Sequence, residues 1–504
     1  TVEKATIIRT ATFINGIRVS AIHTKTYWVD STINNRYNLP VISIISDSLN
    51  FFGAKKGIYV RGDFGEGFKN EKTGNFDLSG DEWERPVHIE YLTSKGELEF
   101  SQDAGIRIHG NYTRKAPQKS LRLYARKEYG KKYFSCKLLP NRNIDKYKRF
   151  ILRATVGDYH DNYYPMITDV VAHNIVKNLD LEYQEDKAVV VFLNGEYWGI
   201  HTIRDRIDGY YYENFCDVDK DDIEELDIFN QESSDYYQYI LANNLAEDNA
   251  YQEFQTLIDI DNFIDYSCAQ IFLASTEWPY STNYKMWRSR SLKNPWRWVF
   301  FDLDIAMVYF YNNSLYNLYY SNTYTCQEKS SLIYRELWKN EFFLKKFLDR
   351  YYELLDTEFH PSVTIPFVEE KKNELLQEMP FHIKRWHVPK SLETWEIDVE
   401  ETLVQYFIKE LFGNVKANDG LSHGEFILAP NPNNGQFSII NLSETPIINK
   451  ISITNLLGQN VFSMTDIKLE SSYYIDVSNL PAGSYYITIY YDNQVEQQQI
   501  LLTK

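Results

Sequence analysis

A chain of 504 residues with 43% hydrophobic and 24% charged residues has the length and composition of two or three globular domains. Its formal net charge of -17 excludes nucleic acid as an expected partner, because a phosphate backbone selects basic surfaces. The sequence has no run of about 18 apolar residues, so no transmembrane segment is predicted.

The first 30 residues have the pattern of β-strands. Polar and apolar positions alternate on both sides of Asn15-Gly16, a pair that favours a tight turn between two strands. The segment does not resemble a signal peptide, and we expect it to be the end of a β-domain that continues before residue 1.

Residues from about 38 to 412 begin with strand-rich segments, such as 104–126 and 187–208. Helical patterns follow, for example over 262–275 and 330–355. Residues 413–424 are polar and contain glycine, which is typical of a linker. Residues 425–504 contain only short strands separated by turn residues, which predicts a small β-sandwich. The predicted fold class is therefore α+β, followed by a small all-β domain.

The four cysteines, Cys136, Cys216, Cys268 and Cys326, are far apart in the sequence and include no Cys-x-x-Cys pair. This spacing argues against a zinc site. Free thiols and one or two disulfides are both compatible with it.

The segment 282–304 predicts a β-hairpin that ends in acidic residues. Residues 282–290 form the first strand, 291–295 the turn, and Asn283 stands at the start of the first strand. If the second strand runs on to Asp304, Asp302 and Asp304 share one side with Trp298, because strand residues two apart face the same way. Oxygen ligands of this kind suit magnesium or calcium. The alternative is that both acids bind backbone amides in a turn.

Lys119 alternates with Leu121 and Leu123, so it is predicted on the apolar face of a strand. A buried ammonium group needs a partner, and a carboxylate or a phosphate would serve. The alternative is a lysine whose head group reaches solvent at a sheet edge. A strand lysine followed by an acid, an amide and a metal-binding acid is the order of parts in a kinase-like phosphotransferase.

Four segments together resemble the CotH kinase family of spore-coat-type atypical kinases. They are "RIHGNYTRKAPQKSLRL", "FILRATVGDYHDNYYPMITDVV", "FLNGEYWGIHTIRDRID" and the stretch that ends in "WRWVFFDLD". The first 30 residues resemble the end of a chitobiase-type β-domain. The tail, with "PNPNNGQFSI" and "DVSNLPAGSYYITI", resembles the C-terminal sorting domain of the Bacteroidetes type IX secretion system.

The resemblance implies a two-lobed, atypical protein-kinase-like domain over 38–412 that binds ATP with Mg²⁺, with Ca²⁺ or Mn²⁺ as alternative metals. It implies that Lys119 binds the α- and β-phosphates of ATP. It makes Asn283 and Asp302 metal ligands, with Asp304 assisting, and it makes Glu277 the base that accepts the substrate hydroxyl's proton.

The resemblance also makes Asp169 the acid that could pair with Lys119, and it places Asp205 in the nucleotide-binding set. The alternative for both is a surface or capping carboxylate. The chain departs from the family pattern at three positions. Glu277 stands where the "DWP" motif has aspartate, Asp205 where glutamate is usual, and Thr168 where arginine is common.

Two functions follow from these expectations. The first is a secreted or cell-surface kinase that transfers the γ-phosphate of ATP to Ser or Thr of a protein. The second is a kinase-fold surface protein with little or no activity that acts in adhesion or scaffolding. In both, the tail engages the type IX secretion machinery, and the protein reaches the outer-membrane surface or the medium after periplasmic transit.

Overall fold

The computed structural model describes most of the chain. In the main part it covers residues 6–28, 38–68, 73–154, 164–275, 278, 283–307 and 325–407. In the tail it covers residues 426–429, 435–441, 448–455, 459–467, 472–481, 483–491 and 494–502.

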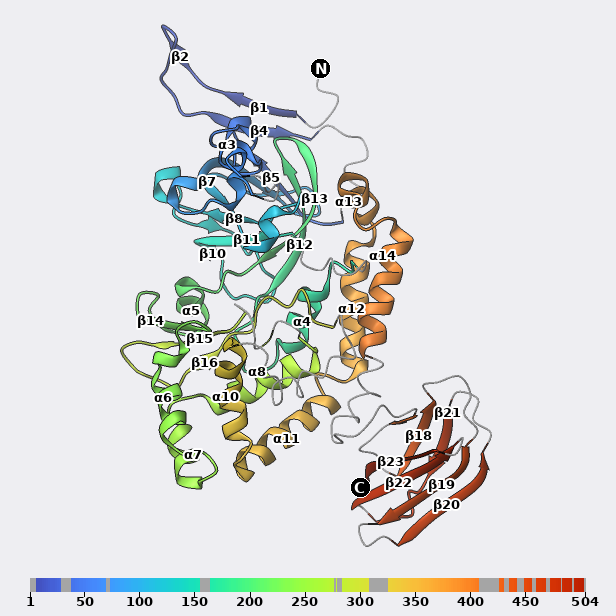
Figure 1. Cartoon of the computed structure of the whole chain (residues 1–504). Coiled ribbons are helices and arrows are strands. Elements are labelled where there is room, and N and C mark those ends of the chain that lie inside the picture. The colour runs from blue at the N-terminus through green and yellow to red at the C-terminus, as the bar shows by residue number, and fades with distance from the viewer. Residues whose placement is uncertain are drawn as a thin grey trace.

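The N-terminal strands form two antiparallel pairs (Figure 1). β1 (Thr6–Thr10) pairs with β4 (His23–Tyr27), and β2 (Phe13–Ile14) pairs with β3 (Ile17–Arg18). Asn15 and Gly16 connect β2 and β3 with φ values of 50° and 77°. Two successive positive φ angles are those of a type I′ hairpin turn, so the predicted turn at this pair is confirmed.

A closed seven-stranded barrel follows, with the strand order β11-β13-β12-β5-β6-β7-β8. Its strands are β5 (Val41–Ile45), β6 (Arg85–Leu92), β7 (Leu98–Ile108), β8 (Leu121–Tyr124), β11 (Arg149–Arg153), β12 (Asp186–Leu193) and β13 (Glu196–Arg204). β12 and β5 are parallel, and the other neighbouring pairs are antiparallel. Smaller elements beside the barrel are α2 (Ser48–Phe52), α3 (Gly62–Glu66), β9 (Phe134–Ser135) and β10 (Lys146–Tyr147).

β12 joins the barrel to the helical part of the molecule. Val189 and Val191 belong to the hydrophobic cluster inside the barrel, whereas Val190 and Phe192 belong to the cluster that the helices share. A strand buried on both faces is apolar at nearly every position, which explains the unbroken run "AVVVFL".

The helical part contains a three-stranded sheet, β14-β15-β16, made of β14 (Ile223–Asp227), β15 (Lys285–Ser289) and β16 (Arg297–Trp298). Its helices are α4 (Thr168–Val176), α5 (Gly209–Phe215), α6 (Asp235–Ala242), α7 (Asp248–Phe254), α8 (Ile260–Phe272), α10 (Thr325–Leu337), α11 (Glu341–Asp356), α12 (Pro361–Leu376), α13 (Met379–Trp386) and α14 (Leu392–Val399). α12 packs on α4, and α13 packs on β13 of the barrel. None of the helices within the described ranges is long and apolar enough to cross a membrane.

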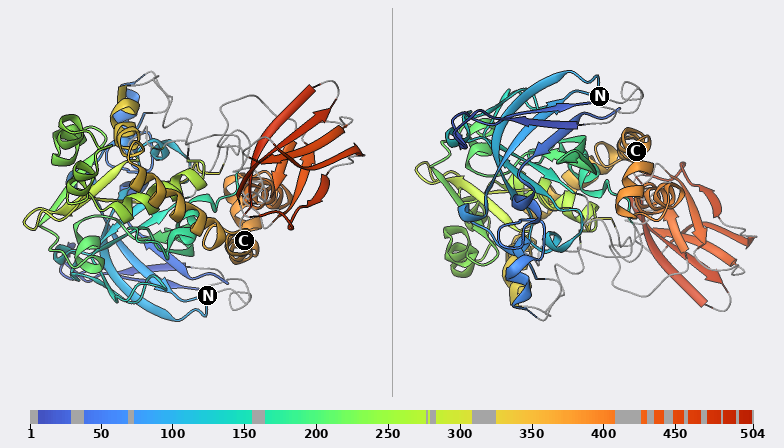
Figure 2. Two further views of the ribbon diagram at one scale, coloured as in Figure 1. Left: turned by 90° about the horizontal axis from the view of Figure 1, so that it is seen from below. Right: turned by 90° about the horizontal axis from the view of Figure 1, so that it is seen from above.

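The tail forms two antiparallel sheets around its own hydrophobic core. The first sheet contains β17 (Phe426–Ala429), β18 (Gln436–Asn441) and β21 (Ser472–Asp476). The second contains β19 (Ile448–Asn455), β20 (Asn460–Ile467), β22 (Gly483–Tyr491) and β23 (Gln494–Leu502). Buried side chains of both sheets form one cluster, as expected for a sandwich. These strands lie apart from the barrel in both views of Figure 2. The mixture of helices and sheets confirms the α+β class.

Candidate functional site

A cavity of about 1220 Å³ lies where the barrel meets the helical part. On the barrel side its walls come from the connection between β7 and β8, from β8 itself and from the end of β11. On the helical side they come from Asn283, from the residues after β16 and from α13 and the residues after it. Of the predicted site residues within the described ranges, Asn283, Asp302 and Asp304 line this cavity.

The predicted hairpin brings Asn283 and the acidic pair together. β15 pairs with β16 in antiparallel fashion, with Met286 opposite Trp298. The Asn283 side-chain amide donates a hydrogen bond to the backbone carbonyl of Asp302 at 3.3 Å. The hairpin and its approach to the acidic residues are therefore confirmed.

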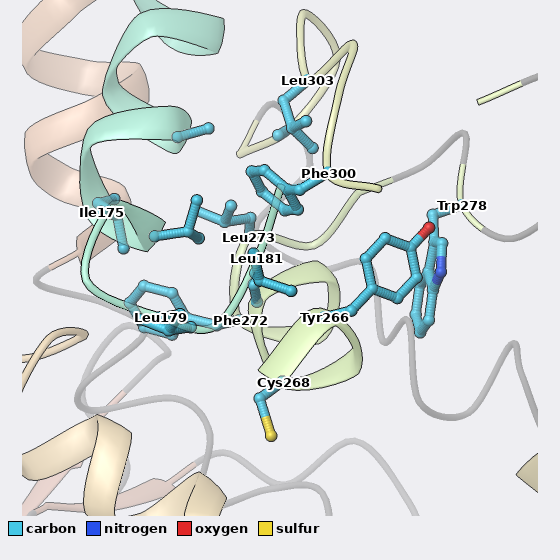
Figure 3. Packing of buried hydrophobic residues seen from close by; sticks show 14 of the residues in the cluster. Ile175, Leu179, Leu181, Tyr266, Cys268, Phe272, Leu273, Trp278, Phe300 and Leu303 are labelled. Carbon is cyan, nitrogen blue, oxygen red and sulfur yellow. The ribbon is translucent and has the colours of Figure 1, made fainter. Parts of the chain in front are cut away.

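The expected continuation of the second strand to Asp304 is wrong, because β16 ends at Trp298 and Asp302 has a φ of 63°. Aspartate tolerates the left-handed region better than most residues, and a residue in that region breaks the alternation of a strand. The Leu303 amide, which donates to Asp169 Oδ1 at 2.9 Å, holds the turn in place. Phe300 and Leu303 anchor it in the helical core on either side of Asp302 (Figure 3).

Arg153, at the end of β11, connects the two acids of this turn. Its Nη2 donates to Asp302 Oδ1 and to Asp304 Oδ2, both at 2.6 Å. Asp302 is the more accessible of the pair, with 39% of its side chain exposed against 12% for Asp304. One guanidinium nitrogen thus occupies a position between the two carboxylates.

One carboxylate oxygen of Asp304 has no partner in this arrangement. Its Oδ1 is buried and has no hydrogen-bond partner. Burial raises the pKa of Asp304 to about 6, while Arg153 acts in the opposite direction and Asp169 adds to the increase. A buried, unsatisfied carboxylate oxygen is costly unless a ligand satisfies it.

The donors present fit a hard divalent cation. Asn283, Asp302 and Asp304 supply carboxylate and carboxamide oxygens, which Mg²⁺ prefers over nitrogen or sulfur. Across the described part of the chain, no group of three or more His, Cys, Asp or Glu side chains could hold a metal ion. A metal here would therefore take its remaining ligands from water or from a phosphate, as Mg²⁺ commonly does.

Asp169 has partners other than the predicted Lys119. Its carboxylate lies 2.9 Å from Arg204 and 3.7 Å from Arg153. Burial opposes the ionisation of Asp169, but Arg204 and Arg153 outweigh it and hold its pKa well below its usual range. The predicted Lys119–Asp169 pair is wrong, because arginines of β11 and β13 reach this acid instead. Asp169 therefore contacts a residue of the cavity wall, Arg153.

Lys119 does not line the cavity. Its Nζ donates to the carbonyl oxygens of Arg114 and Ala116 at 2.6 and 2.8 Å and lies 4.1 Å from the centre of the Phe76 ring. The partner that a buried ammonium requires is thus the backbone of the connection between β7 and β8. This geometry gives no support to a contact between Lys119 and a phosphate.

Burial lowers the pKa of Lys119 to about 8 from 10.5, its usual value. The unfolded chain then binds more protons than the folded chain between these two pH values, so Lys119 lowers stability below pH 8 and this penalty disappears as the pH rises to 10.5. Relative to Lys119→Met, the wild type should gain up to about 3 kcal/mol over this interval. Denaturant unfolding of both proteins at several pH values measures their free energies of unfolding. A difference between the two proteins that stays constant from pH 8 to 10.5 would contradict the prediction.

Asp205 is also outside the cavity lining. Its Oδ2 lies 2.7 Å from Arg142 Nε and accepts a hydrogen bond from the Glu185 amide at 3.1 Å. Burial raises the pKa of Asp205, with Arg142 opposing that effect. Arg142 thus gives this buried acid a partner within the protein.

Glu277 lies outside the described residues, so its predicted role stays a prediction. Trp278, which follows it, is described and is buried. The centres of the Trp278 and Tyr266 rings lie 6.2 Å apart (Figure 3).

Cys136, Cys216 and Cys268 are free thiols.

Several cavity residues were not predicted from the sequence, namely His109, Arg122, Arg153 and Arg206. Arg122 has the strand parity of Gln118 and Ser120, which also line the cavity. The signal was thus available in "QKSLRL" on the strand face opposite Lys119. Arg153 could not be recognised in the same way, since its role depends on pairing between distant segments.

The barrel and the helical part thus meet at a cavity that is lined by a pair of carboxylates, Asp302 and Asp304. The family model for CotH kinase protein matches residues 106–411, more than half of the 504 residues, and the chain belongs to this family. The model for the secretion system C-terminal sorting domain matches residues 428–503. A search of curated proteins found no match.

The sorting domain points to secretion or the cell surface and implies interaction with the type IX secretion machinery. Deletion of residues 425–504 should therefore abolish export and leave the barrel and helices folded, because the tail has its own core. Cell fractionation and circular dichroism of the truncated chain measure both effects. Export of the truncated chain, or its failure to fold, would contradict this assignment.

Proposed function

We propose that the protein is an exported, kinase-like phosphotransferase that binds ATP with Mg²⁺ in the cavity and phosphorylates Ser or Thr of a protein substrate. The observation that carries the proposal is the convergence of Asn283, Asp302 and Asp304 on one cavity between the barrel and the helices. In this interpretation the barrel and the helical part are the two lobes of a kinase-like domain, which is consistent with membership of the CotH kinase family.

The roles of the residues follow from their chemistry. Asn283, Asp302 and Asp304 would hold the metal, and the bound ion would neutralise charge on the phosphates. Asp169 and Arg153 position the acidic turn through the contacts to Leu303 and to both acids. Glu277 would accept the proton of the substrate hydroxyl. The hydroxyl oxygen would then bond to the γ-phosphorus while the bond to the leaving diphosphate breaks.

A second candidate is a surface protein without transfer activity. Two observations favour it. Glu277 carries one methylene more than the usual aspartate, and Arg153 already binds both acids of the turn. A displacement of about 1 Å can cost on the order of a hundredfold in rate. Such a protein could bind a nucleotide and act in adhesion or scaffolding.

The proposed binding predicts stabilisation that needs both components. ATP with Mg²⁺ at 100 times the dissociation constant should raise the free energy of unfolding by about 2.7 kcal/mol. Thermal unfolding is measured with ATP and Mg²⁺ together, with each alone, and with adenosine and Mg²⁺. An equal midpoint in all four samples at millimolar ATP would contradict nucleotide binding and leave the scaffold hypothesis.

A further inference from the structure

The barrel side of the cavity carries a basic surface that faces the acidic turn. His109 follows β7, Arg122 lies on β8, and Arg206 lies two residues after the end of β13. All three residues line the same cavity as Asp302 and Asp304. We call His109, Arg122 and Arg206 the basic wall.

Arg122 has no carboxylate partner among the described residues. Its Nη1 donates to the Tyr124 hydroxyl at 3.2 Å, and its Nη2 donates to His109 Nδ1 at 2.6 Å. Its Nε is buried and has no hydrogen-bond partner. A partly buried guanidinium whose side-chain hydrogen bonds go only to neutral groups keeps its charge and an unused donor, and both favour an anion.

His109 does not offset this charge. Burial lowers the pKa of His109 well below its usual value, and Arg122, Arg153 and Arg206 lower it further. The ring is therefore neutral and accepts the Arg122 hydrogen bond through Nδ1.

Arg206 is only partly neutralised. Its Nε lies 3.1 Å from Asp208 Oδ2, but the same oxygen lies 2.9 Å from Arg149 Nε. One carboxylate thus serves two guanidinium groups. The positive charge of the basic wall therefore exceeds the negative charge of its described acidic neighbours.

The face of residues 118–123 that lies opposite Arg122 offers no cation to an anion in the cavity. Lys119 is held by two backbone carbonyls, and Leu121 and Leu123 are buried inside the barrel. The only cation that β8 presents to the cavity is Arg122.

We propose that Arg122, supported by Arg206, binds the phosphate chain of the ligand, so that the phosphates lie between the basic wall and the acidic turn. This rests on the proposed function for the identity of the ligand, a nucleoside triphosphate. The anion site itself rests on the unpaired Arg122 and on its place in the cavity. Arg122 therefore takes the phosphate-binding role that the family resemblance implies for Lys119.

Inorganic tripolyphosphate tests the anion site without the nucleoside. We expect calorimetry on the full chain to show binding that weakens with salt, since screening reduces charge interactions. Arg122→Gln should weaken the binding about tenfold or more, because a charge-assisted hydrogen bond is lost. Arg122→Lys, which keeps the charge, should recover part of the affinity. The matched control is Arg126→Gln, which removes an arginine that binds Glu84 outside the cavity lining and should bind as the wild type does.

The same proteins are titrated with ATP and Mg²⁺, and with adenosine. If tripolyphosphate binds and needs Arg122 while ATP does not bind, the anion site stands and the nucleotide function fails. If ATP binds equally well to the wild type and to both Arg122 variants, the nucleotide function stands and Arg122 is not its phosphate ligand. Absence of tripolyphosphate binding to a folded wild type, or equal binding by Arg122→Gln, overturns the proposed anion site.

Discussion

Asp304→Asn is expected to weaken Mg²⁺-dependent ATP binding by about 100-fold or more. Replacement of a residue that only supports a metal ligand already lowers metal affinity about 10- to 100-fold. Asp304 would be a ligand itself. Its Oδ1 is buried and unpaired, and its Oδ2 is held by Arg153. Amide substitution removes the charge at constant shape. Calorimetric titration with ATP and Mg²⁺ measures the loss.

Asp103→Asn is the matched control for this variant. Asp103 lies on β7, pairs with His88 and has 54% of its side chain exposed. It is outside the cavity lining, so its amide variant should bind ATP as the wild type does. The role of Asp304 is refuted if its amide variant is folded, as judged by circular dichroism, and binds ATP with unchanged affinity.

Glu277→Ala is expected to lose most phosphate transfer and to keep ATP binding nearly intact. A general base contributes roughly a hundred- to ten-thousandfold to the rate, and it acts on the substrate hydroxyl and not on the nucleotide. Glu277→Asp should keep the activity or raise it, since aspartate has the reach that is usual in the family pattern. Transfer from labelled ATP to a Ser-rich peptide, or to the protein itself, is measured for the three proteins.

The three rates separate the two functions. Equal transfer by the wild type and both variants would remove Glu277 from the mechanism. If neither the wild type nor Glu277→Asp transfers phosphate although both bind ATP, the adhesion or scaffold function is favoured over the enzyme.

The local features of the site were predictable because they depend on short stretches of sequence. The turn at Asn15-Gly16 and the hairpin that brings Asn283 to Asp302 follow from turn residues between alternating strands. The position of Asp302 and Asp304 at one cavity was also expected, although the reason was wrong. A left-handed turn at Asp302 places them there, and not the alternation of a strand.

The side-chain partners were not predictable from periodicity. Lys119 does lie on a buried face, but its ammonium group is satisfied by carbonyls three and five residues before it. Periodicity shows that a buried charge needs a partner and cannot show that the backbone supplies one. Arg153 and Arg204 reach Asp169 only because β11 and β13 are neighbours in the barrel.

The central claim is that the cavity binds a nucleotide with a metal, and isothermal titration of the full chain with ATP tests it most directly. We predict a single saturable site in the presence of Mg²⁺ and a large loss of affinity when Mg²⁺ is removed by a chelator. Absence of binding heat at millimolar ATP and Mg²⁺, in a chain shown to be folded, would contradict the claim.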